Sequence, residues 1–164
     1  MTNFKPGKIV EKFSKDGAEY VVRYPQWTDL DEMLTYINNL SQEETYISFC
    51  GKKVSRQEEI EYLTNLFKNN ELGDGIILFV FHKEKLIGSA QVERDKSVQK
   101  RKLHIGTFGI SIAKEYRNKG LGEKLTRIVI DEANQAIADL KMITLHVYKP
   151  NQAALNLYKK IGFK

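Results

Sequence analysis

The sequence predicts a single mixed α/β (α+β) domain over residues 1–164, with a mostly antiparallel sheet flanked by helices. Segments with strand character occur in neighbouring pairs, first near the N-terminus and again in the middle of the chain, which is typical of antiparallel strands. Two amphipathic segments of helical period separate these pairs. A long amphipathic segment later joins two strands, and a connection of that length allows a parallel crossover. At 164 residues the chain can bury one sizeable core.

Two strands joined by a tight turn are expected at the N-terminus. The segments IVEKF at 9–13 and AEYVVRY at 18–24 are rich in β-branched and aromatic residues. An Asp-Gly pair at 16–17 lies between them and is typical of a hairpin turn. Pro25 is expected to end the second strand.

The next two elements are expected to be helices. Thr28 is the expected N-cap of the first, and Ser55 with Glu58 forms a capping-box pattern at the start of the second. Apolar residues recur at helical spacing in both segments, namely Leu30, Met33, Leu34 and Ile37 in the first and Ile60, Leu63 and Phe67 in the second. The Gly-Asp-Gly run at 73–75 ends the second helix.

The middle of the chain is expected to supply the body of the sheet. GIILFVFH at 75–82 is almost wholly apolar, so we expect it to be buried on both faces. A turn at 83–85 leads into a second strand, LIGSAQVERD at 86–95. The basic run KSVQKRK at 96–102 is expected to be a solvated hairpin loop, followed by a third strand, KLHIGTFGISIA at 102–113.

A long helix, a strand and a short helix complete the chain. From Leu121 onward, apolar residues keep helical spacing for roughly five turns; these residues are Leu125, Ile128, Val129, Ala133, Ala136, Ile137 and Leu140. MITLHVY at 142–148 predicts a strand. The last helix is expected to begin at the N-cap Asn151 and to stop at Gly162. The sheet is thus predicted to be antiparallel at its centre and parallel around the long helix.

The composition is that of a globular protein without a membrane or secretory segment. Apolar residues make up 41% of the chain and charged residues 29%, which is ordinary for such a protein. No apolar run approaches the roughly 18–20 residues that span a bilayer, and the N-terminus lacks an apolar signal-peptide core. The single cysteine, Cys50, excludes an internal disulfide framework and fits a reducing cytoplasm. We expect it to be a packed small residue rather than a nucleophile.

The net charge of +5 would suit a polyanionic partner, either nucleic acid or a phosphate-rich cofactor. Charge alone does not distinguish the two. The basic run at 96–102 lacks the interleaved aromatic residues on which bases stack. We therefore expect neither nucleic acid nor a membrane as a partner.

A glycine-containing turn precedes the long helix. The segment YRNKGLGE at 116–123 places Gly120 and Gly122 at the helix mouth, where each glycine costs about 1 kcal/mol in helix propensity. The free N–H groups of a helix N-terminus attract anions, and glycine lets a phosphate approach the backbone. The polar residues 117–119 supply further donors, although a tight turn with solvated basic residues is the alternative. Neither a Walker loop nor a G-x-G-x-x-G fingerprint is present.

Two motifs resemble those of the GNAT superfamily of acyl-CoA-dependent N-acetyltransferases. The turn Arg117-x-x-Gly120-x-Gly122 is similar to motif A, R/Q-x-x-G-x-G/A, whose amides hold the coenzyme A pyrophosphate in that family. The C-terminal segment is similar to N-x-x-A-x-x-L-Y-x-x-x-G-F, matched by Asn151, Ala154, Leu157, Tyr158, Gly162 and Phe163. Two motifs in the right order are far more specific than either alone. The resemblance, from about Tyr20 to Lys164, implies acetyl-CoA as co-substrate and no metal.

The resemblance implies a role for each matching residue. Ile110, Ser111 and Ile112 match the strand whose backbone pairs with the pantetheine arm, and the N–H of Ile112 would stabilise the oxyanion. Cofactor contacts are also implied for Arg117, Asn118, Lys119, Gly120, Leu121, Gly122, Glu123 and Asn151. Tyr158 matches the tyrosine that protonates the departing thiolate, which a phenol can do at neutral pH. Periodicity alone also fits a core tyrosine at 158 and a plain N-cap at 151.

The base is less well defined than the acid. The attacking amine must be neutral, so a base or a water relay is needed unless the pKa of the amine is already low. His146 is the candidate, because imidazole titrates near neutral pH and some protein-acetylating relatives carry a glutamate base on this strand. A surface or half-buried strand histidine is the alternative. No Asp or Glu occurs at 107–112, where other relatives place their base.

The resemblance implies an acceptor site formed by the two N-terminal helices. That region is acidic, which would suit a cationic amine, although solvated helix faces explain the same charges; the residues are Asp29, Asp31, Glu32, Glu43, Glu44, Glu58, Glu59 and Glu61. Small-molecule amines and peptide or protein amines both remain candidates. Trp27 and Tyr46 either line this pocket or, as we expect, belong to the core.

Two alternatives concern the whole molecule. Relatives continue into further strands beyond the position of Lys164, so we expect either C-terminal strands missing from this sequence or a partner subunit, as in a homodimer, over the exposed edge. A domain that binds acyl-CoA without catalysis, as a sensor or scaffold, is the alternative function. Asn151 and Tyr158 favour an enzyme in which the amine attacks acetyl-CoA directly in a ternary complex.

Overall fold

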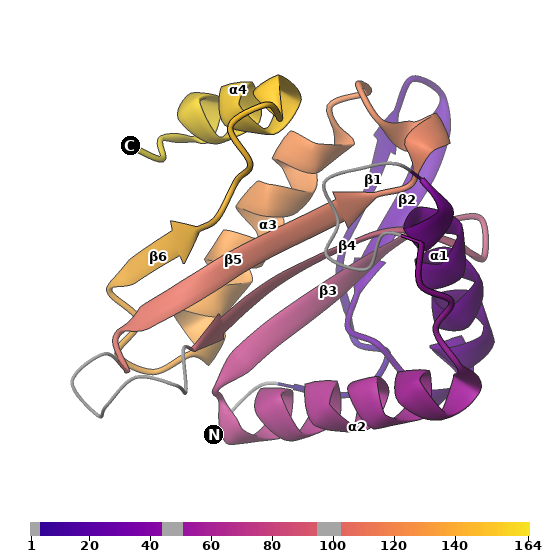
Figure 1. Cartoon of the computed structure of the whole chain (residues 1–164). Coiled ribbons are helices and arrows are strands. Elements are labelled where there is room, and N and C mark those ends of the chain that lie inside the picture. The colour runs from indigo at the N-terminus through magenta and orange to yellow at the C-terminus, as the bar shows by residue number, and fades with distance from the viewer. Residues whose placement is uncertain (1–3, 44–50, 95–102) are drawn as a thin grey trace.

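The computed structural model describes residues 4–43, 51–94 and 103–164. Within these ranges the elements are, in order, β1 (Ile9–Lys15), β2 (Ala18–Arg23), α1 (Leu30–Gln42), α2 (Arg56–Leu72), β3 (Gly75–His82), β4 (Lys85–Arg94), β5 (Ile105–Ile112), α3 (Leu121–Ala136), β6 (Met142–Leu145) and α4 (Gln152–Ile161) (Figure 1). No helix in these ranges is long and apolar enough to cross a membrane. Glu44, Tyr46, Cys50 and the basic run at 96–102 lie outside the described residues.

The strands form one sheet in the order β1-β2-β3-β4-β5-β6. Neighbouring strands are antiparallel from β1 to β5, and β5 pairs with β6 in parallel. A parallel pair requires a crossover connection, which α3 supplies here. The predicted mixed α/β domain, with an antiparallel centre that becomes parallel around the long helix, is confirmed.

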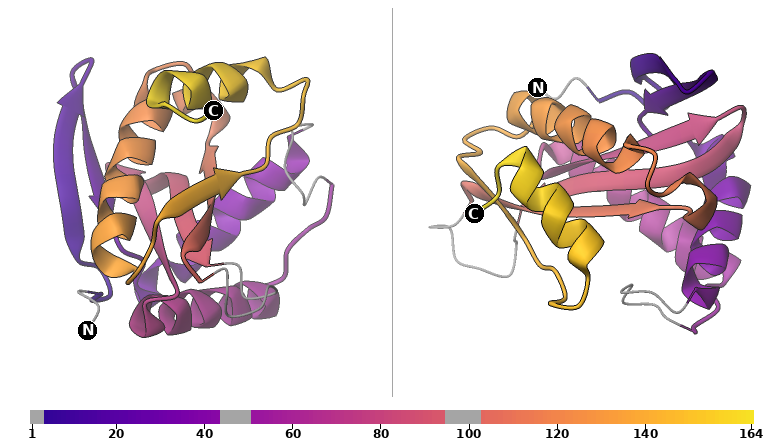
Figure 2. Two further views of the ribbon diagram at one scale, coloured as in Figure 1. Left: turned by 90° about the vertical axis from the view of Figure 1, so that its left-hand side faces the viewer. Right: turned by 90° about the horizontal axis from the view of Figure 1, so that it is seen from above.

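Helices cover both faces of the sheet, as Figure 2 shows from the side and from above. The cluster on the α3 face includes Leu78 and Val129, and the cluster on the α1 and α2 face includes Ile77 and Leu63. Successive side chains of β3 enter these two clusters in turn, so every residue of β3 except His82 is buried. The prediction that this strand is buried on both faces is therefore confirmed.

The start of α1 differs from the prediction. Thr28 lies inside a short 3-10 helix, Trp27–Asp29, and the α-helix begins only at Leu30. Asp29 accepts two hydrogen bonds from the guanidinium of Arg23, at 2.7 and 2.6 Å, and one from the N–H of Gln26 at 2.9 Å. This nearly buried ion pair links the end of β2 to the 3-10 helix ahead of α1. The carboxylate of Asp29 thus accepts a backbone N–H there, which is the role that we predicted for Thr28.

Two side chains in this region lie where we did not expect them. Trp27, expected in the core, is 52% exposed and contacts Phe67 edge-on with ring centroids 4.8 Å apart. Glu59, expected on a solvated helix face, is only 5% exposed. Burial raises the pKa of the Glu59 carboxyl above its usual 4.5. The acidic region around α1 and α2 is thus partly internal.

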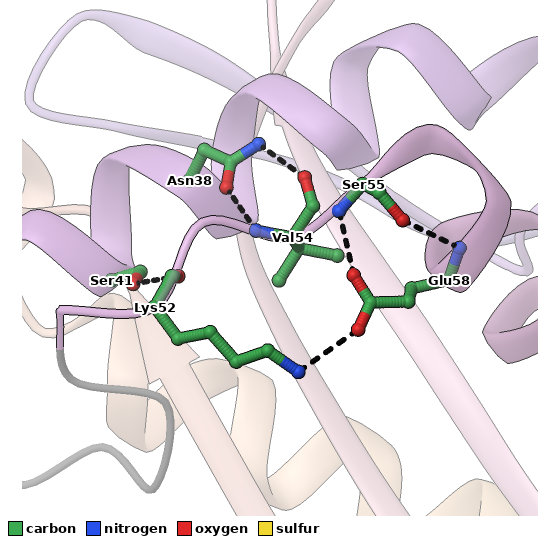
Figure 3. A network of polar contacts seen from close by, with 6 residues as sticks. All are labelled: Asn38, Ser41, Lys52, Val54, Ser55 and Glu58. Carbon is green, nitrogen blue, oxygen red and sulfur yellow. Dashed lines mark hydrogen bonds and ion pairs between the residues drawn. The ribbon is translucent and has the colours of Figure 1, made fainter.

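The connection between α1 and α2 is held by side-chain hydrogen bonds (Figure 3). The amide of Asn38 accepts from the N–H of Val54 at 2.8 Å and donates to its carbonyl at 3.1 Å. The predicted capping box is confirmed, because Glu58 donates its N–H to Ser55 Oγ at 3.2 Å and accepts from the N–H of Ser55 at 2.8 Å. Lys52 also donates to Glu58 at 2.9 Å. The bonds of Asn38 thus tie the residues just before α2 to α1.

The long helix is shorter than predicted. It ends at Ala136 because Ile137 has an extended backbone, with φ −100° and ψ 107°. Ile137 and Leu140 nevertheless pack on the same core as the helix residues before them. Asp139 adopts a left-handed φ of 57°, which reverses the chain towards β6. The apolar spacing therefore continues past the end of the helix that it predicted.

Candidate functional site

The candidate site begins where β5 and β6 separate. The two strands are paired only from Ile105 opposite Met142 to Phe108 opposite Leu145. β6 ends there, short of the predicted end at 148, whereas β5 continues beside β4 to Ile112. Figure 1 shows the chain after β6 turning away from β5 towards α4. In the described part of the chain, no strand pairs with residues 109–112 on that side, and we call this segment the open edge of β5.

The backbone of the open edge is oriented by its pairing with β4. Ala113, just after β5, donates its N–H to the carbonyl of Ile87 on β4 at 2.8 Å. Bonded and non-bonded pairs alternate along an antiparallel ladder. The backbone groups of Ser111 are therefore directed at β4, whereas those of Ile110 and Ile112 point away from β4. Of the three predicted strand residues, Ile110 thus directs both its N–H and its carbonyl to the open edge, and Ile112 directs its N–H there.

Ser111 is turned to the opposite face of the sheet. Its Oγ lies 2.9 Å from the hydroxyl of Tyr36 and 3.1 Å from the Oγ of Ser89, whereas Ile110 and Ile112 pack on the α3 side. Burial raises the pKa of Tyr36 well above its usual value. Tyr36 also lines a cavity of about 220 Å³ between α1, the start of β4 and the segment that follows β5. Sequence reasoning missed Tyr36, because a helical tyrosine 75 residues before Ser111 carries no local signal of this contact.

The loop before α3 has the conformation of an anion site. Asn118 and Gly120 both have a left-handed backbone, with φ 59° and 76°. The first turn of α3 closes when Lys124 donates its N–H to the carbonyl of Gly120 at 3.2 Å. The amides of Leu121, Gly122 and Glu123 precede this bond, so they point out of the helix mouth with the positive end of the helix dipole. These amides could hold a phosphate, and that role stays a prediction from the motif.

The bare backbone of each glycine faces a different neighbour. A Cβ on Gly120 would lie 3.0 Å from Cε and 3.2 Å from Nζ of Lys15. A Cβ on Gly122 would lie 3.4 Å from a methyl group of Leu157 on α4. Gly120 therefore makes room for a lysine of the N-terminal hairpin, whereas a Cβ on Gly122 would only touch α4. Sequence reasoning missed Lys15 altogether.

Arg117 connects the loop to two other elements. Its Nε donates a hydrogen bond to the carbonyl of Ile112 at 2.8 Å, and its Nη2 lies 2.5 Å from Oε2 of Glu43 at the end of α1. The guanidinium is therefore engaged by the end of β5 and by α1. The loop's capacity for an anion lies mainly in its backbone amides.

Other charged side chains of the loop are also engaged. Glu123 lies 3.1 Å from Arg127 and 2.6 Å from Lys160 of α4. Hydrogen bonds from Lys160 and Arg127 keep the pKa of Glu123 below its usual 4.5. The ammonium of Lys119 lies 5.3 Å from the ring centroid of Tyr116. The carboxylate of Glu123 is thereby neutralised by two cations beside the helix mouth.

The last helix places Tyr158 against the strands that separate. Asn151 caps α4 by accepting a hydrogen bond from the N–H of Ala154 at 3.2 Å, which confirms the predicted N-cap. The ring of Tyr158 lies 6.0 Å from that of Phe108 on β5 and 5.9 Å from that of Phe163. Burial raises the pKa of Tyr158 above 10.0, so the phenol stays protonated at neutral pH. Its hydroxyl has no hydrogen-bond partner among the described residues.

His146 directly follows β6, at the point where the chain leaves β5. It is therefore not inside the last strand, as we predicted, but at one side of the separation. Its side chain is exposed. Across residues 4–43, 51–94 and 103–164, no group of three or more His, Cys, Asp or Glu side chains is arranged to hold a metal ion.

Known proteins resemble this chain in sequence and in fold. Residues 25–163 match the model of the acetyltransferase (GNAT) family. An N-alpha-acetyltransferase from Sulfurisphaera tokodaii is 25% identical over 151 residues, which cover 92% of this chain and 84% of that protein. A GNAT-family acetyltransferase structure from Streptococcus pneumoniae is 31% identical, with a TM-score of 0.75 over 87% of this chain and 83% of its own. A Salmonella typhimurium structure with its cofactor acetyl-CoA shares the fold at 17% identity, with a TM-score of 0.73 over 88% of this chain and 79% of its own.

Proposed function

Because the chain belongs to the acetyltransferase (GNAT) family, we propose that it transfers an acetyl group from acetyl-CoA to a primary amine and that residues 1–164 act as one catalytic domain. The observation that carries this proposal is the placement of three features on neighbouring elements. They are the open edge of β5, the loop at the mouth of α3, and Tyr158 on α4, whose ring contacts Phe108 at the start of the separation.

The residues present fit acetyl-CoA. The amides at the mouth of α3 suit its pyrophosphate, since they point outward and carry partial positive charge. The backbone groups of Ile110 suit the amides of the pantetheine arm, which would pair with the open edge as an added strand, and the N–H of Ile112 would face the thioester at its end. The side-chain oxygen of Asn151 caps α4, which leaves the NH2 group of the same amide to contact the arm. Acetyl-CoA supplies an activated acetyl thioester to this site.

The chain would assist the transfer through two groups. As the amine nitrogen forms its bond to the thioester carbon, negative charge develops on the carbonyl oxygen, and the N–H of Ile112 is directed to the side where it would stabilise that charge. When the carbon–sulfur bond breaks, the Tyr158 hydroxyl would donate a proton to the thiolate. Because the pKa of Tyr158 is raised, its proton is retained at neutral pH until it is needed.

We propose the α-amine of a peptide or protein as the acceptor. The relative from Sulfurisphaera tokodaii is an N-alpha-acetyltransferase. An α-amine has a pKa of about 7.7–8.0, far below that of lysine, so an appreciable fraction is neutral near pH 7. This choice fits a β5 segment, IGTFGISI, that carries no carboxylate base. His146, beside the separation of the strands, would then accept the proton that the amine loses.

The proposal is tested by following free CoA with a thiol reagent. The protein is incubated with acetyl-CoA and short peptides that have a free N-terminus, and mass spectrometry locates the acetyl group. The same peptides with a blocked N-terminus are the matched control, and a polyamine is tested in parallel. Release with the free peptides alone is expected. Release of CoA with the polyamine alone would mean that the acceptor is a small-molecule amine and not a peptide. Binding of acetyl-CoA without release of CoA for any amine would instead favour a sensor or scaffold.

A further inference from the structure

A lysine of the N-terminal hairpin lies against the mouth of α3. Lys15 is the last residue of β1, which forms one edge of the sheet. Its Nζ lies 3.2 Å from the position that a Cβ of Gly120 would occupy, and its Cε lies 3.0 Å from that position. The ammonium is therefore placed over the bare backbone of Gly120. The hairpin is distant from this loop in the sequence, so only the fold brings the two together.

The carboxylates around this mouth are paired with other cations. Glu11, on the same strand as Lys15, lies 2.5 Å from Lys124. Glu123 lies 2.6 Å from Lys160 and 3.1 Å from Arg127. The ammonium of Lys15 has no ion pair or hydrogen bond to any residue in the described ranges. Its charge at this point is therefore not balanced by a neighbouring side chain.

An unbalanced cation at this position is electrostatically unfavourable. The N-terminus of a helix carries about half a positive charge, so the ammonium of Lys15 and the mouth of α3 repel each other. An anion bound between them would be attracted by both. The same residue thus lowers the stability of the empty loop and raises its affinity for a negatively charged ligand.

We propose that Lys15 is a further phosphate-binding residue of the coenzyme A site, contributed by the N-terminal hairpin. This inference rests on the proposed function, because it takes coenzyme A as the anion. The chemistry that Lys15 recognises is a phosphate group, which coenzyme A carries in its pyrophosphate and again at the 3′ position. Lys15 would therefore affect affinity for the phosphorylated part of the ligand and leave the contacts of the pantetheine arm unchanged.

Calorimetric titration tests this with three probes. Coenzyme A has both kinds of phosphate, dephospho-coenzyme A keeps only the pyrophosphate, and pantetheine has neither. Lys15→Met is expected to weaken coenzyme A binding about fivefold at low salt, with a smaller loss at high salt. Pantetheine binding should not change. A loss that persists with dephospho-coenzyme A assigns Lys15 to the pyrophosphate, and a loss that disappears assigns it to the 3′-phosphate.

Two further variants separate a phosphate contact from an effect on the fold. Lys15→Arg keeps the charge and should retain most of the affinity. Lys12→Met removes an exposed lysine of the same strand. Lys12 lies three residues from Lys15, so its side chain points to the other face of the sheet. This variant should bind coenzyme A as the wild type does. Equal affinity of Lys15→Met and wild type for coenzyme A would overturn the inference but leave the proposed function intact. Equal weakening for pantetheine would also overturn it, whereas a wild type that binds no coenzyme A would overturn the proposed function itself.

Discussion

Arg117 donates a hydrogen bond from its Nε to the carbonyl oxygen of Ile112 at 2.8 Å. Ile112 is the last residue of β5, and its N–H is the proposed oxyanion donor. The same guanidinium reaches Glu43 at the end of α1 at 2.5 Å. One side chain thereby connects the open edge of β5, the loop before α3 and the helix that borders the proposed acceptor side.

Replacing Arg117 should therefore affect both stability and turnover. Arg117→Ala removes a charge-assisted hydrogen bond and a half-buried ion pair, so we expect the free energy of unfolding to fall by about 1–3 kcal/mol. Turnover should fall as well, because the Ile112 backbone loses its support. Lys119→Ala, in the same loop, is the matched control for stability, since the ring of Tyr116 is the only interaction partner of its ammonium in the described ranges. Urea denaturation and acetyl-CoA kinetics measure both effects, and equal stability of the two variants would contradict the prediction.

The two glycines of the loop should respond differently to the same substitution. Gly120→Ala must adopt a left-handed φ of 76° and meets Lys15, so we expect a loss of about 1–2 kcal/mol. Gly122→Ala has ordinary helical geometry, and its 3.4 Å contact with Leu157 is offset by better helix propensity. Its unfolding free energy should stay within about 0.5 kcal/mol of wild type. Equal losses in a urea titration would show that the left-handed backbone is not what requires glycine at 120.

Tyr158→Phe should separate catalysis from packing. The ring contacts with Phe108 and Phe163 are kept, and the hydroxyl that is lost has no partner among the described residues. We therefore expect an unchanged melting temperature and an unchanged affinity for acetyl-CoA. Turnover should fall roughly a hundredfold, the usual range for a general acid. Stopped-flow or steady-state measurement of CoA release checks this, and unchanged turnover would remove Tyr158 from the chemistry.

The pH profile of the wild type gives an independent measure of the same role. Since burial places the pKa of Tyr158 above 10.0, the acid form persists through neutral pH and is lost only at higher pH. The alkaline decline of turnover should therefore lie at higher pH than an ordinary tyrosine would give, and it should be absent from the residual activity of Tyr158→Phe. An identical decline in both proteins would assign it to another group.

The fold and the motif-based parts of the site could be predicted from local sequence, and the contacts between distant segments could not. The apolar run at 75–82 indicated a strand buried on both faces, and short motifs proposed Gly120, Gly122 and Tyr158 as site residues. Periodicity indicates which face of an element a residue occupies but not which residue it meets there. The contact of Tyr36 with Ser111 joins residues 75 positions apart, which explains why it was missed.

The end of the long helix shows a second limit of periodicity. Ile137 and Leu140 have the spacing of helix residues, yet the helix ends at Ala136. Both side chains reach the same core from an extended segment and a turn. A position that packs on the core is apolar whether its backbone is helical or extended. The apolar pattern therefore predicts burial better than it predicts where a helix ends.

Two adjacent glutamates of α2 should have opposite effects on stability as the pH changes. Burial raises the pKa of Glu59 above 4.5, and its carboxyl has no partner among the described residues. The folded state therefore binds this proton more tightly than the unfolded state. The contribution of Glu59 to stability is present below the unfolded pKa and is lost as the pH rises through the folded pKa. Glu59→Gln should thus be more stable than wild type at neutral pH, by about 1 kcal/mol, and this advantage should vanish near pH 4.

Glu58 is the matched control because its pKa is shifted in the opposite direction. Hydrogen bonds from the N–H of Ser55 and the ammonium of Lys52 lower its pKa to about 2. Its contribution is present above the unfolded pKa and is lost as the pH falls from 4.5 towards 2. Glu58→Gln should therefore lower the melting temperature at neutral pH, with a deficit that shrinks on acidification. Melting temperatures of the wild type and both variants across acid and neutral pH measure the two slopes, and parallel curves for the two variants would contradict the buried, unpaired state of Glu59.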